Sequence, residues 1–398
     1  MPKKSKPIYD YSISKDNETG KQFKDCYSEP FVTAAALMPD AHLGYVAPIG
    51  SVLITKEFIV PAWVGFDIGC GLIAVNLFPK SKSLSSSQLV KQIKSKLKEI
   101  YSAVINVVPM GLGETNSSKS KNHDLHEKTL SSLKKLIEKL EFQEHDKSIL
   151  QHIKQISAKH LGSLGSGNHF IELSTNKENN ELWIIIHSGS RGLGHKVAQK
   201  YMMKSSGSEK KAEYEQTFPL SDKSELGKEY LALLDFGLEY ALLNRLEISY
   251  RVKEAIESVL KVKLESKLFA NKNHNHAIYE KGKYIHRKGA TPAKKGEKGI
   301  IPANMRDGSF LVEGLGNPKF LNSSSHGTGR QMSRKKAKST ISMSDFKKEM
   351  SGIQGTISEK TLDEAPQAYK DTNQVMGAQK DSIKIKKHLL PLINWKGS

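Results

Sequence analysis

The chain has 398 residues, of which 37% are hydrophobic and 26% are charged, and its basic residues outnumber its acidic residues by 61 to 42. The absence of low-complexity tracts and of any apolar run near roughly 18 residues excludes a disordered chain and a membrane-spanning helix. The net charge of +19 favours polyanionic partners, above all nucleic acid. The lysine-rich start lacks the apolar segment of a signal peptide, so we expect a cytoplasmic protein.

The first part of the chain predicts strands followed by helices. Apolar runs separated by Gly and Pro at 31–40, 49–69 and 72–78 are typical of strands. Within them, residues 63–76 (WVGFDIGCGLIAVN) have the composition of a buried strand that runs into a tight turn. Residues 85–104 predict a helix with a serine N-cap. Two more helices should follow, and the first places four apolar residues on one face: Leu130, Leu133, Ile137 and Leu140.

The second part alternates glycine-rich loops, strands and one long helix. Residues 161–173 and 182–202 predict strands joined to glycine loops, and 204–227 has the lysine and serine content of a surface loop. A helical pattern extends from about 231 to 262, and short strands and loops fill the last third. We therefore expect a mixed α/β fold in one large domain over residues 1–398, with helical insertions near 85–160 and 204–262.

The loops contain a set of side chains suited to binding metal ions. The only two cysteines, Cys26 and Cys70, have neither disulfide-framework nor zinc-finger spacing. Cys70 follows Asp67 by three residues, and five histidines lie in glycine-rich or polar loops: His169, His187, His274, His276 and His326. Oxygen, sulfur and nitrogen donors of this kind can hold one or two divalent ions, with the thiolate as a bridge. The softness of these ligands favours zinc.

Two sequence features allow other interpretations. Residues 182–198 resemble the phosphate-binding turn of short-chain dehydrogenases, and Tyr279 and Lys283 have the spacing of their catalytic pair, but Ser188 replaces the first glycine and regular βαβ units are missing. A P-loop is absent, and MRDG at 305–308 lacks the lysine of lysine-dependent nucleotidyl transferases. The basic run at 329–338 fits either a solvated helix face or a site for an anionic chain. Its cations are Arg330, Arg334, Lys335, Lys336 and Lys338.

Seven ordered motifs resemble those of the RtcB family of RNA ligases. They are MPDAHLGYVAPIGSVL (38–53), VGFDIGCG (64–71), GSLGSGNHFIEL (162–173), HSGSRGLGH (187–195), HRKGATPAKKGEKGIIPANM (286–305), GNPKFLNSSSHGTGRQMSRKKAK (316–338) and INWKG (393–397). The resemblance implies joining of RNA 3′-phosphate or 2′,3′-cyclic phosphate ends to 5′-hydroxyl ends, in tRNA splicing or RNA repair.

The resemblance also implies cofactors and roles for individual residues. Two Mn²⁺ ions are expected, one held by Asp67, Cys70 and His169 and the other by Cys70, His187 and His274. His326 is the expected nucleophile, which attacks the α-phosphorus of GTP to form a histidine–GMP intermediate. An activating partner of the archease type is a further possibility.

Nucleotide contacts carry over from the family to several segments of this chain. The expected contacts are Asn168, His169, Phe170, Ile171, Glu172, His274, Asn275, Pro302, Ala303, Asn304, Met305, Ser309, His326, Gly327, Thr328, Gly329 and Lys396. Glu172 is suited to the guanine edge because a carboxylate accepts paired N–H donors.

The chain also departs from the family pattern, as a divergent paralogue would. Thr328 replaces a common alanine, PANM replaces PGSM, Ser166 replaces a glycine, and serines replace cysteines before His326. Two alternatives to the ligase therefore stay open: a metal-dependent phosphoesterase acting on RNA ends, and a non-catalytic RNA-binding paralogue. His42, His195, His276 and His286 are expected to be structural or phosphate-facing rather than metal-bound.

Overall fold

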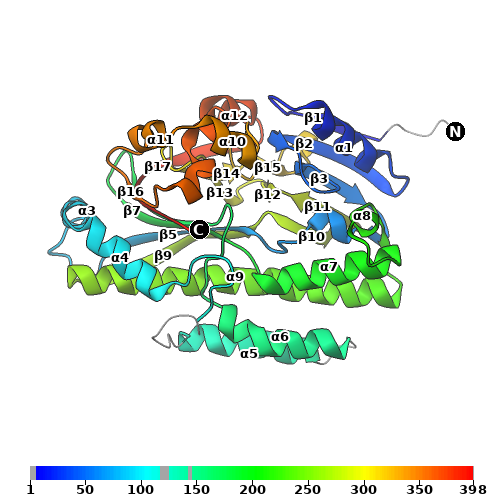
Figure 1. The fold of residues 1–398 in the computed structure, drawn as a ribbon, viewed down its shortest axis with the longest axis horizontal. Coiled ribbons are helices and arrows are strands. Elements are labelled where there is room, and N and C mark those ends of the chain that lie inside the picture. Colours follow the sequence, from blue (N-terminus) through cyan, green and yellow to red (C-terminus); the bar gives the residue numbers. More distant parts are fainter. Residues whose placement is uncertain (1–5, 117–124, 142–145, 398) are drawn as a thin grey trace.

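The computed structural model describes residues 6–116, 125–141 and 146–397 and has the expected mixed α/β fold (Figure 1). The largest sheet has eight strands, and its main path follows the order β13-β14-β17-β6-β7-β5-β9. Along that path these strands are Lys298–Pro302, Ser309–Gly314, Ile383–Lys396, Phe170–Asn176, Leu182–Ser188, Gly71–Pro79 and Leu264–Asn273, with β16 (Gln354–Gly355) paired to β17.

A second sheet of five strands lies beside the first and contains the N-terminal strands. Its order is β1 (Ile8–Asp10), β2 (Val32–His42), β3 (Ile49–Thr55), β11 (Lys283–Lys288) and β10 (Asn275–Glu280). Two small strand pairs complete the described β structure: β12 (Ala290–Pro292) with β15 (Ser323–Ser325), and β4 (Phe58–Ile59) with β8 (Leu220–Ser221). Because β9 leads directly into β10, the two sheets meet at residue 274.

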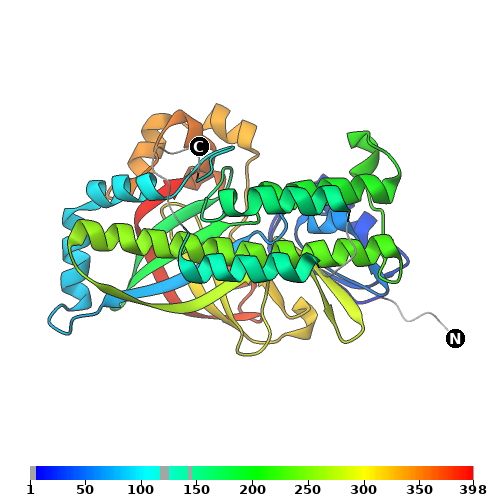
Figure 2. The ribbon, with the colours of Figure 1, turned by 90° about the horizontal axis from the view of Figure 1, so that it is seen from below.

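Helices cover the large sheet on one side in two layers (Figures 1 and 2). The long helix α9 (Glu225–Leu260) packs directly on β5, β7 and β9, and α4, α5 and α7 pack against α9. Apart from α9, the described helices are α1 (Asn17–Ser28), α2 (Pro61–Val64), α3 (Ser86–Ser95), α4 (Leu97–Val107), α5 (Glu127–Glu141), α6 (Lys147–His160), α7 (Gly192–Ser206), α8 (Lys211–Tyr214), α10 (Arg334–Thr340), α11 (Met343–Glu349), α12 (Thr372–Ala378) and 3-10 turns at Pro318–Phe320, Glu359–Glu364 and Pro366–Ala368. None of the described helices is both long and apolar enough to cross a membrane.

Burial explains why the strands of the large sheet are apolar along most of their length. Every residue of β6 and β7 is buried, because α9 and α4 cover one face and apolar side chains of β13, β14 and β17 pack against the other. Ile184, Ile186 and Ile171 pack with Ile248 of α9 in one core cluster. Strands buried on both faces lack the polar alternation of a half-exposed sheet.

Several boundaries differ from the sequence prediction. The strand and glycine loop predicted over 182–202 give way at Gly192 to helix α7. Residues 61–64 form the short helix α2 rather than strand, because Pro61 starts a helical turn and the β5 strand begins only at Gly71. The helix predicted over 85–104 is two helices that break at Lys96, although Ser85 caps the first as predicted. The long helix begins at Glu225, earlier than predicted, because the Ser224 side chain accepts a hydrogen bond from the Gly227 backbone N–H.

Candidate active site

Strand pairing in the large sheet brings four distant segments to one point. Gly71 of β5 pairs with Ser188 of β7 on one side and with Asn273 of β9 on the other, while Phe170 of β6 pairs with His187. The residues that precede or follow these positions are therefore neighbours in space. They are Cys70 before β5, His169 before β6, His187 near the end of β7 and His274 after β9.

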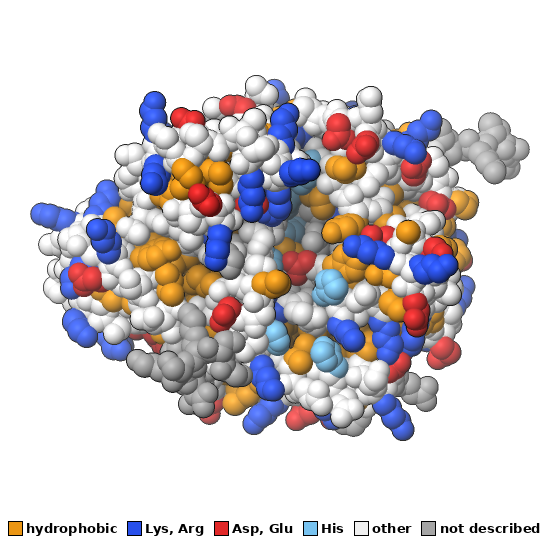
Figure 3. All heavy atoms as spheres, viewed as in Figure 1, with side chains coloured by type: hydrophobic (Ala, Val, Ile, Leu, Met, Phe, Trp, Pro, Cys, Tyr) orange, Lys and Arg blue, Asp and Glu red, His pale blue; other side chains and the backbone are white. Residues whose placement is uncertain are grey.

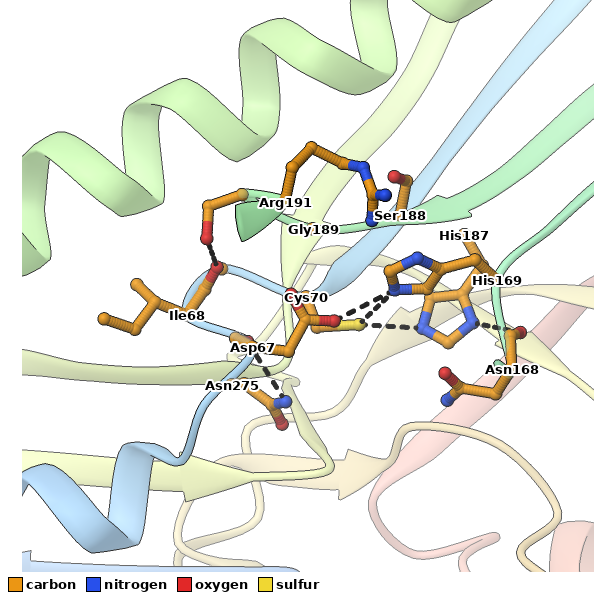
Figure 4. Close-up of polar contacts among 12 residues, drawn as sticks. Asp67, Ile68, Cys70, Asn168, His169, His187, Ser188, Gly189, Arg191 and Asn275 are labelled. Carbon is orange, nitrogen blue, oxygen red and sulfur yellow. Dashed lines mark hydrogen bonds and ion pairs between the residues drawn. The ribbon is translucent and has the colours of Figure 1, made fainter. Parts of the chain in front are cut away.

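The side chains at this point face one another closely enough to share a ligand (Figure 4). The Cys70 sulfur lies 3.4 Å from His169 Nε2 and 3.1 Å from His187 Nε2. Asp67 Oδ2 lies 2.9 Å from His169 Nε2, and His187 Nε2 lies 3.2 Å from His274 Nε2. The five side chains predicted to bind metal thus form one continuous cluster. The donor atoms of Cys70, His169 and His187 all lie within 4.8 Å of one another.

Hydrogen bonds to the backbone decide which imidazole nitrogens carry lone pairs. His169 Nδ1 donates to the Leu164 carbonyl at 3.0 Å, and His187 Nδ1 donates to the Asn168 carbonyl at 3.2 Å. Because these nitrogens carry the protons, both Nε2 atoms are acceptors aimed at the Cys70 sulfur. Acceptors that converge without a donor between them repel one another, so this donor set fits a cation.

The charges of the cluster lead to the same conclusion. Burial favours the neutral form of Asp67, which is 35% exposed, but without a bound cation a protonated His169, donating from Nε2, and the charge of Arg191 lower its pKa to about 2. A bound cation would take the place of that proton. Burial, together with the charge of Asp67, raises the pKa of the Cys70 thiol well above its usual value. Burial also lowers the pKa of His187 and His274. A thiolate in this cluster therefore requires a compensating cation.

Helix α9 holds the segments that carry these donors. Arg245, which is fully buried, donates to the carbonyls of Gly69 at 2.9 Å and Ser188 at 2.7 Å, and to Asn273 Oδ1 at 2.6 Å. One guanidinium thus connects the ends of β5, β7 and β9, and its rigid fork of donors suits that task. Asn244 adds hydrogen bonds to Ser163 and Gly189 carbonyls.

His326, the predicted nucleophile, lies directly beside the cluster. It follows β15, and its ring centroid is 4.8 Å from that of His274. Its Nδ1 is 2.7 Å from Asp40 Oδ2, and the same oxygen accepts the backbone N–H groups of His326 and Gly327. Burial of Asp40 opposes its ionisation, but the charge and hydrogen bond of His326 lower its pKa. The carboxylate therefore keeps the proton on Nδ1 and leaves a lone pair on Nε2.

These groups open into a cavity of about 750 Å³ (Figure 3). Figure 3 shows this face hollowed near its centre, with histidine side chains in the hollow and lysine and arginine side chains around it. Most of the predicted nucleotide contacts line the cavity, namely Asn168, Phe170, Glu172, His274, Asn275, Pro302, Ala303, Asn304, Met305, His326, Gly327, Thr328, Gly329 and Lys396. Three do not: His169 lies behind in the donor cluster, Ser309 donates to Glu172, and Ile171 packs in the core because alternate residues of β6 face opposite sides.

Glu172 lines the cavity as a buried carboxylate. It accepts hydrogen bonds from the hydroxyls of Ser174 at 2.6 Å and Ser309 at 3.2 Å. Burial raises its pKa to about 7, against the opposing effects of these hydroxyls and of Lys396. At neutral pH the group is therefore divided between a form that accepts two N–H donors and a form that does not.

Beyond Glu172, an ion-pair network forms one wall of the cavity. Lys396 Nζ lies 2.6 Å from Glu364 Oε2, and Glu364 Oε1 also pairs with Arg330 at 3.3 Å and Arg334 at 2.7 Å. The charge of Lys396 and its neighbours outweighs burial and lowers the pKa of Glu364 to about 2. Of the basic run, Arg330 and Arg334 thus line the cavity, whereas Lys335 and Lys336 form an exposed face of α10.

Comparison with known proteins identifies the family. The family model described as "tRNA-splicing ligase RtcB" matches residues 22–397. The chain belongs to the RtcB family. It is 34% identical to the RNA-splicing ligase RtcB of Escherichia coli K12 over 88% of this chain and 86% of that protein. It is 30% identical to the tRNA-splicing ligase RtcB of Nanoarchaeum equitans (85% and 83%) and to RtcB homolog 1 of Entamoeba dispar (95% and 81%).

The predicted departures from the family pattern include residues of the cavity wall. Two of them touch each other, because the hydroxyl of Thr328 donates to the carbonyl of Ala303 at 3.0 Å. This bond ties the loop after His326 to the adjacent PANM segment, and both segments line the cavity. None of the departures changes Asp67, Cys70, the three clustered histidines or His326.

Sequence reasoning missed three residues of the site. Asp40, Arg245 and Glu364 lie apart from the expected ligands in the sequence, and each acts through a contact with a distant segment. Asp40 lies in the motif at 38–53, and its place in that motif is the sequence signal that could have identified it. The histidines expected to be structural have such partners: His286 Nε2 accepts from the Val60 N–H at 3.0 Å, and His276 contacts Arg287 at 3.2 Å.

Proposed function

We propose that this protein is an RNA ligase that joins a 3′-phosphate or 2′,3′-cyclic phosphate end to a 5′-hydroxyl end through a histidine–GMP intermediate. The observation that carries the proposal is the placement of His326: its Nδ1 is held by Asp40, and its ring lies 4.8 Å from His274 of the donor cluster. A neutral imidazole with one nitrogen fixed as donor is a good nucleophile at the other nitrogen.

Each step of the proposed reaction forms one bond to a phosphorus atom and breaks another. His326 Nε2 attacks the α-phosphorus of GTP, and pyrophosphate leaves. An oxygen of the RNA 3′-phosphate then attacks the same phosphorus, and His326 leaves, which yields an RNA end activated as a pyrophosphate with GMP. The 5′-hydroxyl of the second strand attacks the RNA phosphorus, and GMP leaves. A cyclic phosphate is first opened by water to the 3′-phosphate.

Two divalent ions complete the proposed site. Asp67, Cys70 and His169 would hold one, and Cys70, His187 and His274 the other, with Cys70 shared between them. Bound cations neutralise phosphate charge that would otherwise repel a nucleophile. We take the ions to be Mn²⁺ from the family resemblance. The nitrogen and sulfur donors alone suit zinc equally well.

The rest of the cavity would hold GTP and the RNA ends. Glu172 accepts the N–H donors of guanine, and Lys288, Arg330 and Arg334 offer cations to phosphates. We propose cleaved RNA, such as tRNA halves, as substrate, consistent with the net charge of +19. A cytoplasmic location and an archease-type activator complete the proposal.

Labelling of the chain tests the proposal. Wild type is incubated with α-labelled GTP and Mn²⁺, and protein-bound label that is lost in acid and stable in base marks a phosphoramidate. His326→Ala should abolish the label, whereas His152→Ala, a histidine of α6 outside the cavity, should retain it. Absence of label on wild type contradicts the proposal.

The same assay decides between the two alternative functions. Hydrolysis of RNA ends without labelling would favour a phosphoesterase, which needs the donor cluster but not His326. RNA binding with neither labelling nor hydrolysis would favour a non-catalytic paralogue.

A further inference from the structure

A cluster of aromatic rings stands at the rim of the cavity, outside the site described above. Phe66, which directly precedes Asp67, has its ring centroid 5.4 Å from that of Tyr45 at an interplanar angle of 85°. Phe66 also stacks on His195 of α7, with ring centroids 4.9 Å apart and an interplanar angle of 21°. Tyr45, Phe66 and His195 come from three separate segments, and we call them the rim cluster.

Two of the three rings of the rim cluster, those of Tyr45 and His195, are exposed, and Phe66 is half-buried. Tyr45 is 56% exposed and its neighbour Leu43 is 43% exposed. Of the large hydrophobic residues that are exposed in the described part of the chain, only Leu43 and Tyr45 line the cavity. Exposed apolar surface next to a binding cavity commonly marks a place that a bound ligand covers.

The loop that carries Tyr45 is held in place. Gln22 Nε2 donates to the Gly44 carbonyl at 2.8 Å, and the Gly44 N–H donates back to Gln22 Oε1 at 3.2 Å. A Cβ at Gly44 would lie 2.5 Å from the Ala47 carbonyl oxygen, so only glycine fits this tight loop. The exposed ring of Tyr45 is therefore presented by a fixed backbone, and a ligand that covers it does not have to order the loop.

The position of the rim cluster indicates what covers it. Phe66 and Asp67 are adjacent in the chain, so the rings lie beside the donor cluster, whose bound cations would neutralise a phosphate. Lys288 and Arg330, which line the same cavity, add positive charge. A nucleotide whose 3′-phosphate reaches the donor cluster carries its base on the same ribose, within reach of the rim. Aromatic side chains bind single-stranded bases by stacking.

We propose that the rim cluster is a base-binding subsite, in which Tyr45 stacks on the base of the RNA nucleotide that carries the 3′-phosphate. This inference rests on the proposed RNA ligase function and extends it to the position of the substrate. Every base has a π face, so the subsite accepts any of the four bases and contributes affinity rather than sequence specificity.

Binding of RNA tests the subsite separately from ligation. The probe is a short single-stranded RNA with a 3′-phosphate and a fluorescein at the other end, titrated with protein and Mn²⁺ in the absence of GTP. Tyr45→Ala should weaken binding about tenfold, the range that loss of one base–aromatic stack gives. Tyr45→Phe keeps the ring and should bind as wild type. Tyr279→Ala is the matched control, because Tyr279 is 61% exposed on β10 and does not line the cavity.

An abasic scan of the probe locates the contact. Removal of the base at the 3′-phosphate nucleotide should weaken wild-type binding by the same factor and leave Tyr45→Ala unaffected. An equal loss in both proteins, or a loss confined to another nucleotide, would overturn the assignment. So would Tyr45→Ala losing guanylylation as completely as RNA binding, because the residue would then shape the whole cavity. Failure of wild type to become guanylylated contradicts the ligase proposal instead and leaves these binding results to be judged on their own.

Discussion

The two walls of the cavity handle buried charge in opposite ways. On one wall, Asp67, Cys70 and three histidines turn oxygen, sulfur and nitrogen lone pairs toward one another. On the other wall, Glu364 is surrounded by the cations Lys396, Arg330 and Arg334, each within hydrogen-bonding or ion-pair distance. The first wall lacks positive charge among its own donors, and the second supplies its own.

The first wall therefore needs a bound cation, whereas the second already contains the cations that neutralise its carboxylate. A wall of acceptors is stable only when a cation binds or when its acids stay protonated, so metal loading changes its chemistry. The ion-pair wall needs no ligand, because its carboxylate and its cations neutralise one another. Its ion pairs stabilise the fold, and its cations also face the cavity. Asp40 and His326 lie between the walls, where a fixed carboxylate prepares a nucleophile.

The largest expected effect is at the junction of the two walls. Asp40→Asn replaces a carboxylate that accepts from three donors with an amide that can turn its NH₂ group toward His326 Nδ1 and favour the wrong tautomer. Guanylylation should slow by on the order of 10³-fold, as for loss of the orienting carboxylate in other histidine sites. Rates with labelled GTP measure this. Asp345→Asn, on the exposed helix α11, should be unchanged, and a wild-type rate in Asp40→Asn would contradict the positioning role.

The next effect tests the acceptor wall. Cys70→Ala removes the sulfur that lies between His169 and His187, so both metal positions should lose affinity together, by about 100-fold or more. Metal content and Mn²⁺ titration measure the loss. Cys26→Ala is the control, since Cys26 is the other buried cysteine and packs in the core. Full occupancy of either position in Cys70→Ala would show that the thiolate is not shared.

The third prediction concerns the compensated wall. Glu364→Gln leaves Lys396 without its carboxylate and should lower the free energy of unfolding by about 3 kcal/mol near neutral pH. Because the folded-state pKa of Glu364 is lowered to about 2, its contribution is complete above the unfolded value and is lost as pH falls toward 2. The two proteins should therefore converge in stability in acid. Glu349→Gln, which removes a more exposed pair with Arg306, should cost less than about 1 kcal/mol.

The smallest effect is a pH dependence of nucleotide binding. Burial raises the pKa of Glu172 to about 7, and only the ionised group accepts both N–H donors of guanine. GTP affinity should rise about tenfold between about pH 6 and 8 in wild type. Glu172→Gln should bind weakly with a flat profile. Calorimetric titration at several pH values measures both, and an equal slope in the two proteins would assign the titration to another group.

Much of the fold and site follows from local sequence signals. Apolar runs predicted β2, β3, β5, β6 and β7, and the serine cap predicted the start of α3, whereas the resemblance to the family predicted which histidines gather. These signals succeed because a fully buried strand must be apolar and because a loop around a metal or phosphate needs small residues.

What could not be predicted depends on partners far along the chain. Asp40 acts on His326 across 286 positions, and Arg245 connects three strand ends from a helix that looks like ordinary core in sequence. The register of the large sheet, which creates these contacts, leaves no local pattern. The break at Lys96 also has no sequence signal, because neither Pro nor Gly occurs there.

Strand β17, near the end of the chain, lies in the interior of the large sheet, hydrogen-bonded to β14 and β6, and delivers Lys396 to the cavity. During synthesis, β14 and β6 must therefore wait with unpaired edges until residues 383–396 emerge. Edges of that kind recruit other chains. A ribosome that stalls shortly before this segment would thus release an aggregation-prone product rather than a weakened enzyme.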